Sequence, residues 1–276
     1  MSKRPRITPR SPERQAVLVV ERYPRDTVYR FRDPEVAEEH EASENPSSRG
    51  EVTCFSYKSR RRCRLMLRSI AHHMTFTFGL TYPRDFPTDG KRVKRNLGAL
   101  LDWFRRRGVG YFWIIEFQER GAPHFHGFLT GPVIGLAEAW NRIISADRPE
   151  YLADPDALKH GAYLAPIESQ DKLASYFTEY MKKLEQKTVP AGYESVGRYW
   201  GFTRSLLAVQ VQEVKGTYRE MSRLMRTERK KYKARLRTWG IKWKTPRAGW
   251  IAWDENKELD KPVQQWYNGG NGGDER

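Results

Sequence analysis

The sequence contains little cysteine, and this scarcity excludes two common kinds of stabilisation. Only Cys54 and Cys63 occur among 276 residues, too few for a disulfide scaffold. Their spacing is not the Cys-x-x-Cys pair that is typical of zinc sites. We therefore interpret both residues as free thiols.

Long hydrophobic runs are also missing. No stretch approaches the roughly 18 apolar residues that are needed to span a bilayer. The basic start of the sequence is not followed by the apolar segment and cleavage site of a secretory signal. We therefore expect no membrane partner and a cytoplasmic location.

Positive charge, in contrast, is abundant. The chain carries 50 Lys and Arg against 34 Asp and Glu, which gives a formal net charge of +16. Such an excess favours a polyanionic partner, and nucleic acid is the partner that we expect. The length allows one substantial core with appended segments.

The hydrophobic pattern predicts an α+β fold with a central antiparallel sheet and packed helices. Alternating threonine, aromatic and aliphatic residues at 74–82 indicate a strand that ends at Pro83. Turn residues between two strand-like runs predict a hairpin. The expected strands are 74–82, 110–117, 124–130 and 163–166, and the expected helices are 91–107, 136–144 and 170–186.

Two histidines lie on one expected strand of the hairpin. Side chains at i and i+2 of a strand face the same way, so His124 and His126 can share one metal ion. The preceding strand returns Glu116 alongside them, which adds a carboxylate. The alternative at this point is a hairpin with two surface histidines and no metal.

The helix expected at 170–186 places two tyrosines beside a lysine. Its core stripe consists of Leu173 and three apolar residues that follow at helical spacing. Tyr176, Tyr180 and Lys183 share an adjacent face, where a nearby cation favours the phenolate form of a tyrosine. Alternatively, the tyrosines only widen the apolar face.

Taken together, these two segments resemble the HUH endonucleases, specifically the replication initiators of filamentous phages and small plasmids. The resemblance rests on Glu-Phe-Gln-Glu-Arg-Gly-Ala-Pro-His-Phe-His at 116–126 and Tyr-Phe-Thr-Glu-Tyr-Met-Lys-Lys at 176–183. The strand ending in Thr-Tyr-Pro and the run Val-Gly-Arg-Tyr-Trp-Gly at 196–201 extend it over roughly residues 52–207. The resemblance implies a sheet of about five antiparallel strands.

The resemblance also implies a site and a reaction. His124, His126 and Glu116 would bind a divalent metal, Mg²⁺ or Mn²⁺. Tyr180, assisted by Lys183, would cut single-stranded DNA at a replication origin and form a 5′-phosphotyrosine. Tyr176 is the second candidate nucleophile, although Glu179 stands where two-tyrosine members often carry its lysine.

Residues 211–253 are strongly basic and predict a helical DNA-binding extension. A solvated helix face anchored by tryptophans is the alternative. The other expected parts are a mostly flexible extension at 1–50, the HUH domain at 51–210 and a flexible tail at 254–276. The candidate nucleic-acid-binding residues are Arg229, Lys230, Lys231, Lys233, Arg235 and Arg237.

Two other functions are compatible with the sequence. One is a transposase or relaxase of the same superfamily, which the order of the metal motif and the tyrosines disfavours. The other is a non-catalytic, zinc-stabilised DNA-binding protein, which would bind without cleavage. No Gly-x-x-x-x-Gly-Lys-Ser/Thr loop occurs, so an initiator of this type needs a helicase and a polymerase from its bacterial host.

Overall fold

The chain divides into two compact units. One comprises residues 48–207, and the other combines residues 1–47 with residues 208–276. The computed structural model describes residues 15–24, 26–32, 54–146, 148–152, 154–169, 173, 189–193, 196–242 and 250–253. Each unit is treated by itself.

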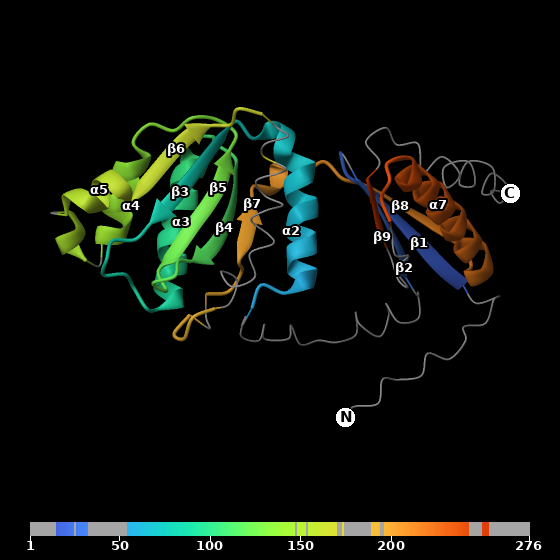
Figure 1. The fold of residues 1–276 in the computed structure, drawn as a ribbon, viewed down its shortest axis with the longest axis horizontal. Helices are drawn as coiled ribbons and strands as arrows, with labels where there is room; N and C mark the ends of the chain where they lie inside the picture. Colours follow the sequence, from blue (N-terminus) through green and yellow to red (C-terminus); the bar gives the residue numbers. More distant parts are fainter. Residues whose placement is uncertain are drawn as a thin grey trace, which may run out of the picture. The chain divides into compact units, whose positions relative to one another are not determined.

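The unit of residues 48–207 contains a five-stranded antiparallel sheet in the order β6-β3-β5-β4-β7 (Figure 1). Together with its helices it makes an α+β fold, which confirms the predicted fold class. The strands are β3 (Phe76–Thr81), β4 (Tyr111–Phe117), β5 (Pro123–Leu129), β6 (Ala162–Pro166) and β7 (Trp200–Phe202).

Four α-helices and three short 3-10 turns accompany this sheet. Helix α3, for example, begins directly after Asp89, which caps it by accepting hydrogen bonds from two backbone amides. The α-helices are α2 (Tyr57–Ile70), α3 (Gly90–Arg106), α4 (Leu136–Ser145) and α5 (Pro155–His160). The 3-10 turns are η1 (Ala71–His73), η2 (Pro149–Leu152) and η4 (Arg204–Leu206).

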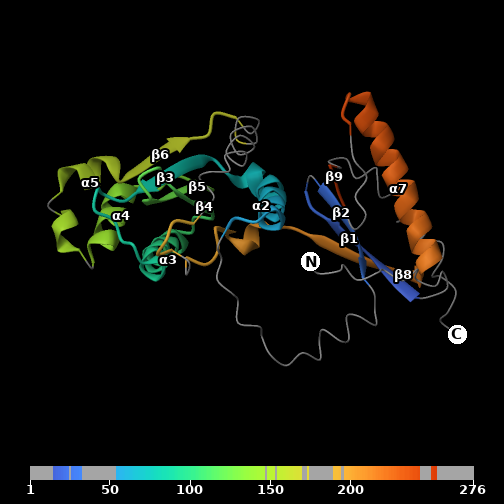
Figure 2. The ribbon, with the colours of Figure 1, turned by 60° about the horizontal axis from the view of Figure 1, so that its bottom comes forward.

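Helices α3 and α4 cover one face of the sheet. The ring of Phe104 in α3 meets Phe78 at 5.5 Å between centroids, and Trp140 in α4 meets Phe125 at 6.0 Å. Figure 2 shows α3 below the sheet, with α4 towards its β6 end. Because alternate residues of a strand face opposite ways, the neighbours of Phe125 in β5 lie on the other face.

Most elements of this unit agree with the sequence prediction to within two residues at either end. Helix α2 and strand β7 were not predicted. The helix expected at 170–186 lies outside the described residues apart from Leu173, which is helical and 3% exposed.

The other unit is built around a four-stranded antiparallel sheet in the order β8-β1-β2-β9. Helix α7 packs across one face of it (Figures 1 and 2). The apolar side chains of β1 that alternate as Ala16, Leu18 and Val20 meet Met221 and Met225 of α7 there. The elements are β1 (Gln15–Arg22), β2 (Asp26–Arg32), β8 (Gln210–Thr217), α7 (Tyr218–Thr238) and β9 (Trp250–Trp253).

This second sheet differs from the prediction for both ends of the chain. Residues 15–22 and 26–32 are strands, not a flexible extension, and residues 211–253 contribute strands as well as a helix. The apolar run at 16–20 finds its partner strand far along the chain: Arg22 donates to the Gln212 side chain at 2.6 Å across the sheet. A pattern read locally does not reveal such a distant partner.

Two smaller expectations concern cysteine and membranes. Cys54 and Cys63 are both free, as predicted, and Cys63 is buried. Among the helices of the described ranges, none has the length and apolar character needed to cross a bilayer.

Candidate functional site

Strand register places Glu116, His124 and His126 on one face of the five-stranded sheet. In the β4–β5 pair Glu116 lies directly opposite His124, and in the β3–β5 pair Thr81 lies opposite His124 on the other side. Residues that are directly opposite each other in an antiparallel pair have side chains on the same face. The carboxylate, the hydroxyl and both imidazoles therefore share the face that α3 and α4 leave uncovered.

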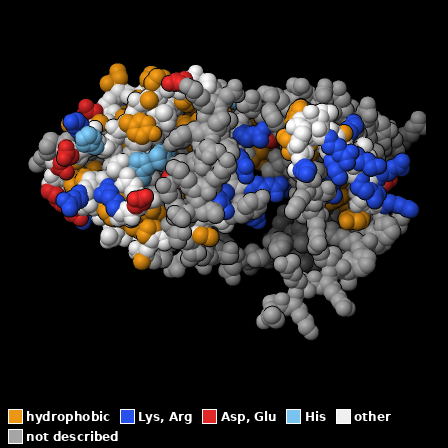
Figure 3. Space-filling view, in the orientation of Figure 1, with side chains coloured by type: hydrophobic (Ala, Val, Ile, Leu, Met, Phe, Trp, Pro, Cys, Tyr) orange, Lys and Arg blue, Asp and Glu red, His pale blue; other side chains and the backbone are white. Residues whose placement is uncertain are grey.

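The side chains of this face are close together and partly buried. The rings of His124 and His126 are 4.2 Å apart between centroids, and His126 Nε2 lies 3.8 Å from Glu116 Oε2. The exposed fraction is 8% for the Glu116 side chain and 20% for His126. Figure 3 shows histidine side chains at the surface of this unit.

Thr81 orients His124. Its hydroxyl lies 2.9 Å from His124 Nδ1, so this ring nitrogen is engaged and Nε2 is the one that a ligand would meet. Burial, followed by the nearby charge of Arg120, lowers the pKa of His124 to about 4. The imidazole is therefore neutral near pH 7, which is the form that binds metal ions.

The fit to a metal lies in the donor set. Within the described part of the chain, no three His, Cys, Asp or Glu side chains stand in a group ready to enclose an ion. Two imidazoles and a carboxylate on one face nevertheless supply the nitrogen and oxygen ligands that divalent metals use in open sites. Rotation of these side chains on a fixed backbone would bring them onto a common ion.

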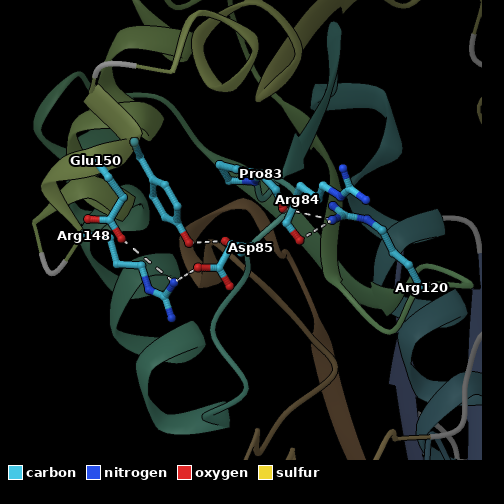
Figure 4. Close-up of polar contacts among 7 residues, drawn as sticks. Pro83, Arg84, Asp85, Arg120, Arg148 and Glu150 are labelled. Atoms are coloured by element: carbon cyan, nitrogen blue, oxygen red, sulfur yellow. Dashed lines mark hydrogen bonds and ion pairs between the residues drawn. The ribbon is translucent and has the colours of Figure 1, made fainter.

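The loop after β3 is tied to the hairpin by one arginine (Figure 4). Arg120, in the β4–β5 turn, donates to the carbonyl oxygens of Tyr82 at 2.7 Å, Pro83 at 2.9 Å and Arg84 at 3.3 Å. Its Nε also donates to the Gln118 side chain at 2.9 Å. A planar guanidinium with several fixed donors suits this task. The contacts hold the loop beside the strand ends that carry the histidines.

Further side chains hold the same loop from its other side (Figure 4). Asp85 forms an ion pair with Arg148, and its carbonyl accepts a hydrogen bond from the Tyr151 hydroxyl. The Tyr193 hydroxyl donates to the Pro87 carbonyl at 2.5 Å. Burial raises the pKa of Tyr193 to about 12, so this phenol keeps its proton and remains a donor. Three separate parts of the chain thus fix the loop.

The structure places the predicted site residues in three different ways. It brings Glu116, His124 and His126 together on one sheet face. The three residues of the predicted tyrosine helix, Tyr176, Tyr180 and Lys183, lie outside the described residues. The six candidate nucleic-acid-binding residues, Arg229, Lys230, Lys231, Lys233, Arg235 and Arg237, all lie on α7.

Sequence reasoning missed two residues of the site. Thr81 lies in the Thr-Tyr-Pro run that marked the end of β3, so its nearness to the histidines could have been inferred from the antiparallel pairing. Arg120 had no such signal, because a turn arginine gives no sign of which carbonyls it contacts.

An antiparallel α+β sheet that carries a His-x-His pair beside a glutamate is the arrangement expected from the resemblance. Residues 75–185 match the model of the family Replication-associated protein ORF2. This match confirms the resemblance over that segment, and the chain is a replication-associated protein of the HUH type. No curated protein sequence matches the chain.

One solved structure with a similar fold is the N-terminal nuclease domain of non-structural protein-1 from Minute virus of mice. The sequences are 9% identical, the TM-score is 0.27, and the match covers 48% of this chain and 77% of that one. That domain is described as coordinating Zn²⁺ in its active-site pocket and recognising DNA at the origin of replication. At this TM-score the likeness carries no argument about the present chain.

The Arg120 contacts predict a measurable loss of stability. We expect Arg120→Ala to lower the free energy of unfolding by roughly 1–2 kcal/mol, because three loop carbonyls lose a charged donor. Arg120→Lys should recover only part of this, since an ammonium cannot span the three acceptors. Urea unfolding would measure both changes.

A matched control is Arg84→Ala, which removes an exposed arginine side chain and keeps the carbonyl that Arg120 contacts. We expect its effect to stay within about 0.5 kcal/mol. Equal stability of Arg120→Ala and Arg84→Ala would contradict the role assigned to Arg120.

Proposed function

We propose that the protein initiates rolling-circle replication by nicking and rejoining single-stranded DNA in a metal-dependent reaction. The observation that carries the proposal is the shared face of Glu116, His124 and His126, located inside the segment that matches the replication-associated family. The same face is left open by α3 and α4, so a DNA strand can approach it.

Glu116, His124 and His126 would hold a divalent ion, Mg²⁺ or Mn²⁺. Oxygen ligands suit both ions, and imidazole favours Mn²⁺ by affinity. When bound, such an ion polarises a phosphate and stabilises the charge that develops on its oxygens. Thr81 keeps the His124 ring in place, and Arg120 keeps the adjacent loop in place.

The attacking group would be a tyrosine of the predicted 170–186 helix. Tyr180 is our first candidate, with Lys183 one helical turn further on to favour the phenolate, and Tyr176 is the second. The phenolic oxygen forms a bond to the phosphorus while the bond from phosphorus to the 3′ oxygen breaks. The products are a 5′-phosphotyrosine and a 3′-hydroxyl, which takes up a proton.

The 3′-hydroxyl would prime a host polymerase, and a host helicase would unwind the duplex. Retention of the bond energy in the phosphotyrosine allows the strand to be rejoined after synthesis. A second tyrosine makes the exchange of strands feasible. The substrate is accordingly single-stranded DNA at a replication origin.

The test is a covalent adduct between protein and DNA. We expect full-length protein with end-labelled single-stranded DNA from its own replicon, and Mg²⁺ or Mn²⁺, to give a labelled band on a denaturing gel. A chelator should remove the band, and His126→Ala should reduce its yield at least about 100-fold. Tyr180→Phe should abolish it.

Thr77→Val serves as the control, because Thr77 lies on the same face of β3 but is opposite Phe128, not a histidine. An undiminished adduct in Tyr180→Phe would move the nucleophile to Tyr176. An adduct that survives both chelation and His126→Ala would refute the metal-dependent mechanism.

Helix α7 would supply a second, sequence-independent contact with DNA. Its buried face comprises Met221, Met225, Glu228, Tyr232 and Leu236. A row of exposed cations at alternating spacings of four and three runs along the opposite face over about 27 Å. Its members are Arg219, Arg223, Arg226, Lys230, Lys233 and Arg237. Figure 3 shows Lys and Arg side chains gathered over this helix.

This cation row differs from the set that the sequence suggested. Arg229 and Arg235 are half-buried: Arg229 reaches Met225 Sδ at 3.6 Å, and Arg235 lies over the Trp239 ring at 5.0 Å. We therefore propose the cation row of α7 as the surface that follows the phosphate backbone. Lys231 is exposed but lies about 100° around the helix from Lys230.

Two neighbouring lysines provide a matched test of the cation row. We expect Lys230→Ala to lower the salt dependence of DNA binding, as the slope of log K against log salt, by about 1. Lys231→Ala should leave the slope unchanged, because its side chain points away from the row. Fluorescence anisotropy at several salt concentrations would measure both, and equal slopes in the two variants would rule out a row-specific contact.

A further inference from the structure

A tyrosine that the proposed reaction does not use lies on the histidine face. Tyr163 in β6 pairs with Gly79 in β3, and Gly79 pairs with His126 in β5. The three residues form one row across neighbouring strands, so their side-chain positions share a face. Tyr163 is 46% exposed, which is unusual for a large aromatic side chain within a sheet.

Gly79 makes room for the tyrosine ring. A Cβ atom added at Gly79 would lie 2.1 Å from Tyr163 Cε1 and 2.7 Å from Cδ1, closer than real atoms approach. The ring therefore lies over the Gly79 backbone and extends from its own strand towards the strand of His126. Any side chain at position 79 would displace it.

We propose that Tyr163 is a stacking platform for an unpaired base of the DNA strand that binds beside His124 and His126. An exposed aromatic ring on the same face as the candidate phosphate-binding site matches the way single strands are bound, with bases on aromatic rings and phosphates on charged groups. Bases within a duplex are already stacked, so the platform selects single-stranded DNA. The inference rests on the proposed function and adds a position for the base.

The phenol hydroxyl has no part in this role. Stacking uses the ring, so Tyr163→Phe preserves the platform and Tyr163→Ala removes it. A role as nucleophile would require the hydroxyl, and a role limited to covering Gly79 would affect stability more than DNA binding. These three roles therefore predict different variants to fail.

The experiment is a double-mutant cycle on the full-length protein. A fluorescent oligothymidylate of about 12 nucleotides is compared with an oligonucleotide of the same length in which abasic residues replace the bases. We expect Tyr163→Ala to bind the oligothymidylate about 5- to 150-fold more weakly, the equivalent of roughly 1–3 kcal/mol per stacked base. Its affinity for the abasic strand should match that of the wild type.

Two further variants sharpen the result. Tyr163→Phe should bind like the wild type, and Gly79→Ala should weaken binding of the oligothymidylate because the added Cβ displaces the ring. Ile134→Ala, which alters a 94% exposed apolar side chain, is the control and should change nothing. Circular dichroism melting of each variant separates weakened binding from unfolding.

The outcomes are distinguishable from those of the nicking reaction. A base-dependent loss in Tyr163→Ala with intact folding supports the platform, whether or not an adduct forms in the nicking assay. Equal losses on both oligonucleotides, or a loss explained by unfolding, would overturn it. Loss of the adduct in Tyr163→Phe with normal binding would also overturn it and assign the tyrosine to the chemistry.

Discussion

The pairing of β4 with β5 determines which side chains share the histidine face. Glu116 lies opposite His124 because the turn between these strands fixes their register. Side chains alternate along a strand, so a slip of one residue would turn His124 and His126 into the core and Phe125 out of it. Phe125 is completely buried against Trp140, and this burial stabilises the observed register. Core packing on one face thus positions the polar groups on the other.

Contacts around the hairpin reinforce this arrangement. Arg120 connects the turn to the loop after β3, and Thr81, the last residue of β3, contacts His124. The site therefore combines a rigid backbone with side chains that are oriented by their neighbours, which is the arrangement that positions reacting groups well. The side chains of His124 and His126 need only rotate to accept an ion.

The sequence predicted the parts of the fold whose partners are close in the chain. The hairpin that carries Glu116 and His124 could be inferred because a short turn leaves only one way to pair the strands. Strand β1 could not, because its partner β8 lies at the other end of the sequence and alternation alone does not identify a partner. Arg120 and the row from Tyr163 to His126 were missed for a related reason: both depend on contacts between elements. The resemblance supplied the tyrosine assignment, which geometry leaves as a proposal.

The central claim is that Glu116, His124 and His126 form one metal site. Isothermal titration of the full-length protein with Mn²⁺ tests it most directly, because binding is measured without DNA or catalysis. The account predicts one Mn²⁺ site per chain whose affinity falls at least about tenfold in both His126→Ala and Glu116→Gln. Unchanged Mn²⁺ affinity in both variants would contradict it.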